Sequence, residues 1–196
     1  MVTSAINYYN DNASDFYNST VKADMSDHYE RFEKHLIKGS RILDAGCGSG
    51  RDSLYFYTKG YKIEAFDASA AMVNLSSQLT GLSVKHALFE DVEFKNKFNG
   101  IWACASLLHI RRELISDVLI RLVSMLCHDG IFYMSFKYGD MVYKKDGRIF
   151  NCYDEKSFAG MIKTISQLRI LELYKTSDLR DGREGEYWLS AIIGKI

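Results

Sequence analysis

The sequence predicts an α/β fold with a doubly wound, mostly parallel seven-stranded sheet that has an antiparallel C-terminal strand. Short apolar runs alternate with segments of helical spacing through five rounds between residues 41 and 165. A glycine-rich loop, DAGCGSG at residues 44–50, follows the first apolar run. The last two runs, at residues 168–174 and 187–193, are joined by a loop too short for a crossover helix, so we expect an antiparallel hairpin there.

The chain is predicted to fold as one compact unit in which residues 1–38 form a helical N-terminal cap on the domain of residues 39–196. The cap is polar, but aromatic residues recur in it at helical spacing and give it faces that can pack on the domain. These residues are Tyr8, Tyr9, Phe16, Tyr17, Tyr29 and Phe32. No repeat, low-complexity tract or linker divides the chain.

The first half of the domain contains two strands, each followed by a helix. Residues 41–45 form the first strand, and the helix after the glycine loop ends at Gly60. Residues 61–66 form the next strand. Ser69 is the expected N-cap of the following helix, which Gly81 ends.

The second half continues the alternation. Strands are expected at residues 83–88 and 100–104. Apolar residues three or four positions apart predict a helix over residues 114–126. A fully apolar run predicts a buried strand over residues 131–136, and the last helix is expected between residues 154 and 165.

The composition is that of a globular protein. Hydrophobic residues make up 47% and aromatic residues 13% of the chain, which argues against a disordered or fibrous class. The 25 basic and 25 acidic residues give no net formal charge, so a phosphate-tracking surface for nucleic acid is not indicated. We expect a monomer or a homodimer.

Cysteine spacing and the N-terminus indicate the compartment. The cysteines, Cys47, Cys104, Cys127 and Cys152, form no CxxC pair, which argues against a structural zinc site and for reduced thiols. The N-terminus shows no signal peptide, and no apolar run reaches membrane-spanning length. A cytoplasmic protein that binds neither a membrane nor a metal is expected.

The glycine loop distinguishes between two ligand classes. A dinucleotide fingerprint, GxGxxG, would place its glycines at positions 46, 48 and 51, but position 51 is Arg. Asp44 stands two residues before the first glycine, and its carboxylate would repel a pyrophosphate. The same carboxylate favours the ammonium and sulfonium of S-adenosylmethionine, which is therefore the expected ligand.

A second acid fits either ligand class. Asp67 ends the second strand, 21 residues after Gly46. At the carboxyl end of a parallel strand it is placed to accept both hydroxyl groups of a ribose.

Several segments together resemble a known family. They are DAGCGSG, EAFDAS, FEDV, GIWACASLLH and DGIFYMSF. Over approximately residues 40–196 the chain resembles the class I S-adenosylmethionine-dependent methyltransferases, and GSGRDSLYFYTKGYKIEAFDAS is similar to the tellurite-resistance type of small methyltransferase. The resemblance implies a Rossmann-like fold and a methyltransferase that converts S-adenosylmethionine to S-adenosylhomocysteine.

The resemblance also implies a cofactor site. Its residues are Tyr17, Asp44, Gly46, Cys47, Gly48, Arg51, Asp67, Ala68, Met72, Glu90, Asp91, Ala105 and Ser106. The glycine loop with Asp44 and Arg51 would hold the methionine end, and Asp67 the ribose. Ala68 and Met72 would lie beside the adenine. Family members usually carry an Asp where this chain has Leu88, so Glu90 or Asp91 is expected near the adenine amino group.

Catalytic and acceptor-binding candidates lie near the later strand ends. His109 is a candidate general base, and Tyr138 is another that would act through a water molecule. His109 has the competing interpretation of a cap for the helix near Arg112. The expected acceptor-binding residues are Tyr9, Lys137, Arg148 and Arg183. Lys137, Arg148 and Arg183 belong to a polar cluster on the late loops, together with Asp140, Tyr153, Arg180, Glu184 and Glu186. One interpretation of this cluster is a pocket for an acceptor that bears a carboxylate or a phosphate. The other is that these are solvent-exposed charges on loops.

The acceptor class follows from absences in the sequence. The chain has no proline, so it lacks the NPPY or DPPY segment of amino-directed DNA or glutamine methyltransferases. A small-molecule acceptor is the leading expectation. An RNA or protein acceptor, a non-catalytic S-adenosylmethionine-binding regulator and a nicotinamide dehydrogenase are the alternatives.

Overall fold

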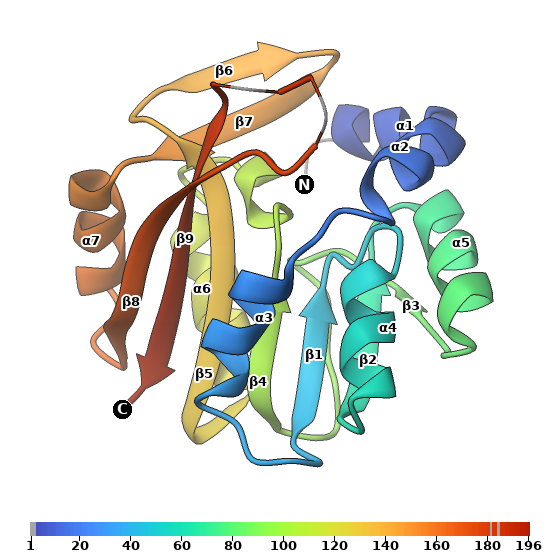
Figure 1. The fold of residues 1–196 in the computed structure, drawn as a ribbon. Coiled ribbons are helices and arrows are strands. Elements are labelled where there is room, and N and C mark those ends of the chain that lie inside the picture. The colour runs from blue at the N-terminus through green and yellow to red at the C-terminus, as the bar shows by residue number, and fades with distance from the viewer. Residues whose placement is uncertain (1–2, 181, 184) are drawn as a thin grey trace.

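The computed structural model describes residues 3–180, 182–183 and 185–196. Helices and strands alternate along most of the chain (Figure 1). The helices are α1 (Thr3–Asp11), α2 (Ala13–Thr20), α3 (Ser26–Glu33), α4 (Arg51–Thr58), α5 (Ala70–Thr80), α6 (Ile115–Ser124), α7 (Glu155–Lys163) and the short 3₁₀ helix η1 (Leu107–His109). The strands are β1 (Arg41–Ala45), β2 (Lys62–Asp67), β3 (Lys85–His86), β4 (Phe98–Ala103), β5 (Leu126–Tyr138), β6 (Val142–Lys145), β7 (Arg148–Tyr153), β8 (Leu168–Ser177) and β9 (Tyr187–Lys195).

The sheet confirms the predicted doubly wound architecture. Strands β3, β2, β1, β4 and β5 lie side by side and are parallel. β9 then pairs antiparallel with β5, and β8 pairs antiparallel with β9. These seven strands are the predicted sheet, with β9 as its reversed strand.

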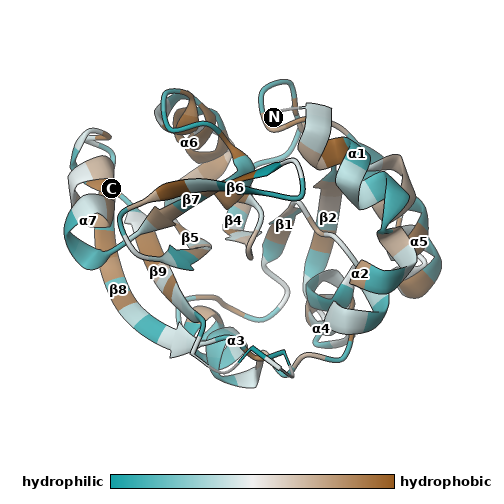
Figure 2. Ribbon diagram, turned by 90° about the horizontal axis from the view of Figure 1, so that it is seen from above, coloured by the Kyte–Doolittle hydropathy of each residue, from teal (hydrophilic) through white to brown (hydrophobic). Residues whose placement is uncertain are grey.

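A short hairpin, β6–β7, adds two strands that the sequence did not predict. β7 pairs with only the last two residues of β5, and β6 pairs antiparallel with β7. Residues 142–148 are mostly charged or polar and show no apolar run, so no strand period is visible there. Figure 2 shows the hairpin above the carboxyl ends of the central strands, extending toward α1.

Strands β3 and β5 differ most in length from the prediction. β3 covers Lys85–His86 rather than residues 83–88, and both of its residues are exposed at the edge of the sheet. β5 spans 13 residues because the polar segment before residue 131 also pairs, with Leu126 in register with Phe98.

The two faces of the sheet bury different residues. Ile101 and Phe132 belong to the apolar cluster under α6 and α7. Their neighbours Trp102 and Tyr133 point to the opposite face, which α3 and α4 cover. The rings of Trp102 and Tyr133 stack with centroids 3.8 Å apart.

Helix α3 fastens the N-terminal segment to the sheet. The Phe32 side chain is completely buried, with its ring 5.2 Å from Trp102 and 5.7 Å from Phe56 between centroids. A Cβ at Gly100 would lie 2.7 Å from this ring, so the absence of a side chain there permits the close packing. By contrast α2 buries no residue and α1 buries only Ala5, so these helices cover the sheet edge without entering the core.

We predict that Phe32→Ala destabilises the protein by about 3–5 kcal/mol, because the deletion empties a packed aromatic site. Urea unfolding measures the free energy. Ile37→Ala is the matched control, since this nearby side chain is 79% exposed. Equal effects of the two substitutions would contradict the docking of α3 on the sheet.

Candidate functional site

A cavity of about 590 Å³ lies at the carboxyl ends of the central strands, where ligands bind in sheets of this topology. Its floor includes the glycine loop after β1 and the ends of β2, β4 and β5. α1, α2 and the β6–β7 hairpin cover it from above (Figure 2). Its volume is in the range of small-molecule sites.

The glycine loop is held in a fixed shape by its neighbours. The amides of Gly46 and Cys47 both donate to the Phe66 carbonyl, at 2.9 and 3.0 Å. Gly46 has a φ of +76°, and a Cβ there would lie 2.6 Å from the Cβ of Ser106. Ser106 in turn donates to the Ala45 carbonyl at 2.7 Å. The loop is therefore packed between β2 and the segment after β4, and its backbone lines the cavity.

Asp67 is the acid at the end of β2. Its carboxylate accepts from the Gly48 amide at 2.9 Å and from the Ser69 amide at 2.8 Å. A carboxylate has about four acceptor positions, so acceptor capacity remains for a ligand in the cavity that Asp67 lines. Burial raises the pKa of Asp67 above its ordinary value, and hydrogen bonds from a ligand would stabilise its ionised form. Ala68 and Met72 line the same end of the cavity.

Asp52 presents a second carboxylate to the cavity. It accepts from Tyr29 Oη at 2.5 Å, from Trp102 Nε1 at 2.8 Å and from Arg51 at 2.6 and 2.9 Å. Although burial opposes ionisation, the Arg51 guanidinium and these hydrogen bonds hold the pKa of Asp52 below its usual value. Asp52 is therefore an ionised group in a buried setting.

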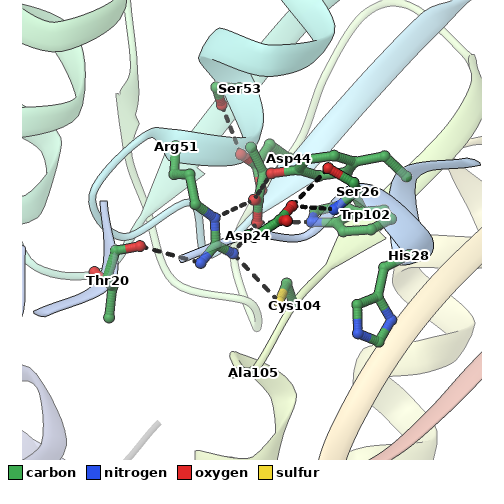
Figure 3. Close-up of polar contacts among 12 residues, drawn as sticks. Thr20, Asp24, Ser26, His28, Asp44, Arg51, Ser53, Trp102, Cys104 and Ala105 are labelled. Carbon is green, nitrogen blue, oxygen red and sulfur yellow. Dashed lines mark hydrogen bonds and ion pairs between the residues drawn. The ribbon is translucent and has the colours of Figure 1, made fainter. Parts of the chain in front are cut away.

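Arg51 also lines the cavity, as expected. Beyond Asp52 it donates to the Thr20 carbonyl at 3.2 Å, which ties α4 to the end of α2. Figure 3 shows the guanidinium between Thr20 and Cys104. Arg51 therefore links the cover of the cavity to its floor.

Asp44 lies beneath the glycine loop and does not line the cavity, contrary to the prediction from the sequence. It is 2% exposed and accepts a hydrogen bond from Ser53 Oγ at 2.6 Å (Figure 3). Burial, with Asp52 nearby, raises its pKa. The acid that faces the cavity beside the glycine loop is Asp52, in the first turn of α4.

His109 lines the cavity with both ring nitrogens already bonded. Nδ1 donates to the Ile149 carbonyl at 2.7 Å, so Nε2 accepts from Tyr9 Oη at 2.8 Å. Burial lowers the pKa of His109 to about 4, which keeps the ring neutral. In this arrangement His109 holds Tyr9 over the cavity, and any role as a base requires Tyr9 to move.

Tyr138 reaches the rim of the cavity by its ring only. Its hydroxyl donates to Glu155 on α7 at 3.0 Å, outside the cavity. The water-mediated base role expected for Tyr138 therefore has no hydroxyl directed at the cavity.

The expected acceptor-binding cations lie on the cavity wall but are paired. Lys137 donates to Asp178 at 2.9 Å and to Glu186, and Arg183 lies 3.4 Å from Glu186. Arg180 also pairs with Asp178, at 2.6 Å. This wall is a partly buried ion network and not a cluster of free positive charge.

Arg148 and Tyr9 come together where the hairpin meets α1. The guanidinium of Arg148 lies 3.5 Å from the centre of the Tyr8 ring and 5.6 Å from that of Tyr9. It also pairs with Asp146 at 3.2 Å. Arg148 therefore fastens the hairpin to α1 above the cavity.

Three expected cofactor residues lie away from this cavity. Tyr17 is on α2, but the residues of that helix that line the cavity are Phe16 and Thr20. Glu90 and Asp91 follow Phe89, which does line it, and neither acid does so. Ala105, Ser106 and Cys47 lie on the cavity wall, whereas Glu184 of the polar cluster lies outside the described residues.

The structure adds site residues that the sequence analysis did not single out. Asp52 gave no signal because acids are common in the first turn of any helix. Asp178 stands in a polar loop whose pairing cannot be read from the sequence. His28 carried a detectable cue, since it is four residues before Phe32 on an amphipathic helix and therefore shares its buried face.

Comparisons with known proteins agree with this geometry. Residues 42–130 match a family model described as a methyltransferase domain. This stretch of the chain is similar to a methyltransferase domain. The resemblance to class I S-adenosylmethionine-dependent methyltransferases expected from the sequence is thereby confirmed.

The chain is also similar to curated proteins. It is 25% identical over 126 residues to an uncharacterised methyltransferase of Staphylococcus carnosus, covering 64% of this chain and 60% of that protein. It is 26% identical over 89 residues to the probable S-adenosyl-L-methionine-dependent methyltransferase TehB of Haemophilus influenzae, covering 43% of this chain and 31% of that one. The chain thus spans less than two thirds of the length of either relative.

A solved structure shows the fold over nearly the whole chain. The 1,6-didemethyltoxoflavin-N1-methyltransferase of Burkholderia thailandensis superposes with a TM-score of 0.79 at 20% identity, covering 98% of this chain and 86% of that one. The likeness establishes the Rossmann-like methyltransferase fold. As a separate finding, no helix in the described ranges is long and apolar enough to cross a bilayer.

We predict that Asp178→Asn lowers the unfolding free energy at pH 7 by about 2 kcal/mol, because Lys137 and Arg180 lose a buried partner. Burial opposes ionisation of Asp178, but Arg180, Lys137 and Trp188 outweigh it and hold its pKa below the ordinary value. A lowered pKa stabilises the fold above the unfolded-state pKa of about 3.9 and ceases to do so as the pH falls. The difference between wild type and variant should therefore shrink below about pH 4.

Urea unfolding at several pH values measures this difference. Asp129→Asn is the control, because that side chain is 83% exposed. A variant that tracks the wild type at pH 7 would rule out a stabilising role for the network.

Proposed function

We propose that this protein is an S-adenosylmethionine-dependent methyltransferase that acts on a small-molecule acceptor. The observation that carries the proposal is the covered cavity, in which the Asp67 carboxylate keeps free acceptor positions beside a glycine loop of a methyltransferase domain. S-adenosylmethionine supplies an activated methyl group on a positively charged sulfur, and S-adenosylhomocysteine is the product.

The residues of the cavity suit the parts of this donor. Asp67 has the positions to accept the two ribose hydroxyls, with Ala68 and Met72 against the adenine. The ionised Asp52 supplies negative charge for the ammonium, and Arg51 is placed for the carboxylate. The glycine-loop backbone and the segment from Ala105 complete the methionine end.

The protein's contribution to transfer is positioning and exclusion of water. The leaving group is a neutral thioether, so no side chain has to bond covalently to the methyl. The aromatic cover formed by Tyr8, Tyr9 and Phe16 keeps the site dry. Ser135 fixes the segment after β4 by accepting from the Ala105 amide at 2.9 Å.

The cover also supports a small acceptor over a macromolecular one. Arg148 and Tyr8 join the hairpin to α1 across the top of the cavity, and a base of RNA or a protein side chain would have to pass this contact. The zero net charge gives no support to an RNA acceptor. The cysteines are free, which fits the reducing cytoplasm where we place the protein as a monomer or homodimer.

We predict that S-adenosylhomocysteine binds the wild type and that Asp67→Asn weakens this binding about 10–100-fold, because hydrogen bonds to a charged acceptor contribute about 1.5–3 kcal/mol. Isothermal titration calorimetry measures both affinities. Asp91→Asn is the matched control, since Asp91 is exposed and outside the cavity.

Two results of this titration would refute the assignment. One is a wild type that binds NADH and not S-adenosylhomocysteine, which would indicate a dehydrogenase. The other is a folded wild type with no affinity for either S-adenosylmethionine or its product. Release of S-adenosylhomocysteine with labelled acceptor from a metabolite mixture separates an enzyme from a non-catalytic binding protein.

A further inference from the structure

His28 is a buried histidine on the cavity wall that the donor site does not use. It lies on α3 and is 5% exposed, yet it lines the same cavity as Cys104, Ala105 and Ser135. Figure 3 shows its imidazole directed away from the Arg51 cluster, on the side of Cys104 and Ala105. A buried titratable ring that faces a ligand cavity is a candidate for a role in the reaction.

His28 lies where two parts of the cavity meet, the donor-binding part and the part lined by Lys137. Trp102 and Tyr133 are in register on β4 and β5, so the segment after β4 runs beside Ser135. Ser135 accepts from the Ala105 amide, and Tyr133 lies on the same face of β5 two residues earlier. His28 contacts Tyr133 and therefore stands where the methionine end of the donor site meets the wall around Lys137.

The hydrogen bonds of His28 fix one nitrogen and leave the other open. Nδ1 lies 3.0 Å from Tyr174 Oη and 3.3 Å from Tyr133 Oη. Tyr133 Oη has Ser190 Oγ at 3.1 Å as a further partner. The described part of the chain offers Nε2 no hydrogen-bond partner, and this nitrogen is the one available to a ligand in the cavity.

His109, Tyr138 and Cys104 are less suited than His28 to take a proton from an acceptor. Two histidines line the cavity within the described ranges, and His109 has both nitrogens bonded. The Tyr138 hydroxyl donates to Glu155 outside the cavity. Burial raises the pKa of Cys104 to about 12, so its thiol stays protonated and is a poor base at neutral pH.

We propose that His28 is the general base of methyl transfer, a role that rests on the proposed function. An acceptor with an O–H, N–H or S–H group uses its lone pair to form the new bond to the methyl carbon. The carbon–sulfur bond of the donor breaks with its electron pair going to sulfur, which becomes a neutral thioether. The proton of the acceptor passes to Nε2 of His28 and later to solvent.

The role requires the tautomer with the proton on Nδ1. In it Nδ1 donates to the Tyr174 oxygen, and Nε2 carries the lone pair. Burial lowers the pKa of His28, so the ring is neutral and ready to accept at neutral pH. The charged groups around His28 are Asp27 and Arg31 on its own helix and the Arg51–Asp52 pair on α4, and their opposite effects on its pKa largely cancel. The hydroxyl groups of Tyr174 on β8 and Tyr133 on β5 are neutral.

The assignment narrows the acceptor class. Lys137 and the arginines on the wall are paired, so the cavity offers little free charge to an anionic group. Met141, Leu179 and Tyr187 line its mouth as exposed apolar side chains. The acceptor is therefore a small molecule with an apolar or aromatic body that loses a proton on methylation.

The test uses His28→Gln in the full chain with methyl-labelled S-adenosylmethionine and the low-molecular-weight fraction of a cell extract. Transfer should fall about 100-fold or more, the range expected for loss of a general base, with S-adenosylhomocysteine affinity within about threefold of wild type. We expect kcat/KM of the wild type to rise with pH as His28 loses its proton, and we expect this rise to be absent in the variant. His35→Gln is the matched control, because His35 faces Glu172 outside the cavity.

A second measurement needs no acceptor. Nitrogen NMR of histidine-labelled protein with bound S-adenosylhomocysteine should show the neutral His28 ring with its proton on Nδ1. Tyr174→Phe, which removes the oxygen that fixes this tautomer, should lower transfer while retaining S-adenosylhomocysteine affinity.

Two results overturn the assignment: transfer by His28→Gln within about threefold of wild type, or a proton on Nε2 of the neutral ring. Failure of the wild type to bind S-adenosylhomocysteine is a different outcome, since it refutes the proposed function first. Thermal unfolding of each variant confirms that losses of transfer are not losses of fold.

Discussion

The buried Asp52 carboxylate is the interaction on which the site depends. It receives hydrogen bonds from Tyr29 on α3, Trp102 on β4 and Arg51 on its own helix. A buried carboxylate is tolerated only with such donors, so the charge requires all three elements to be in place at once. One group therefore joins the N-terminal segment, the sheet and the glycine loop, and it leaves negative charge at the floor of the cavity.

The sheet and most helices were predictable because their signals are local. Apolar alternation, Ser69 as an N-cap and Gly81 as a helix end all act within a few residues of the chain, and each is confirmed. The β6–β7 hairpin was not predictable, because β6 is largely exposed and polar and the hairpin is defined by pairing with the end of β5 and by contact with α1. Its existence depends on tertiary contacts that no sequence period records.

The site residues divide in the same way, into those placed by local sequence signals and those placed by tertiary contacts. Asp67 and the glycine loop could be placed from the sequence because a strand end and a tight turn fix where they lie. Asp44 could not, since whether an acid at a strand end points up to a ligand or down to Ser53 depends on the pleat and on its neighbours. The paired state of Lys137 likewise depends on Asp178 and Glu186, which approach it from another loop.

The weak attachment of α1 and α2 has a consequence for exchange of ligands. These helices bury a single alanine between them and are fastened by polar and ring contacts such as Arg148 with Tyr8 and Asn10 with Ser69. Segments with so little buried apolar surface open at a small fraction of the free energy of global unfolding. The cavity can therefore open to a ligand by transient fraying of α1 and α2, while the sheet and α3 stay intact.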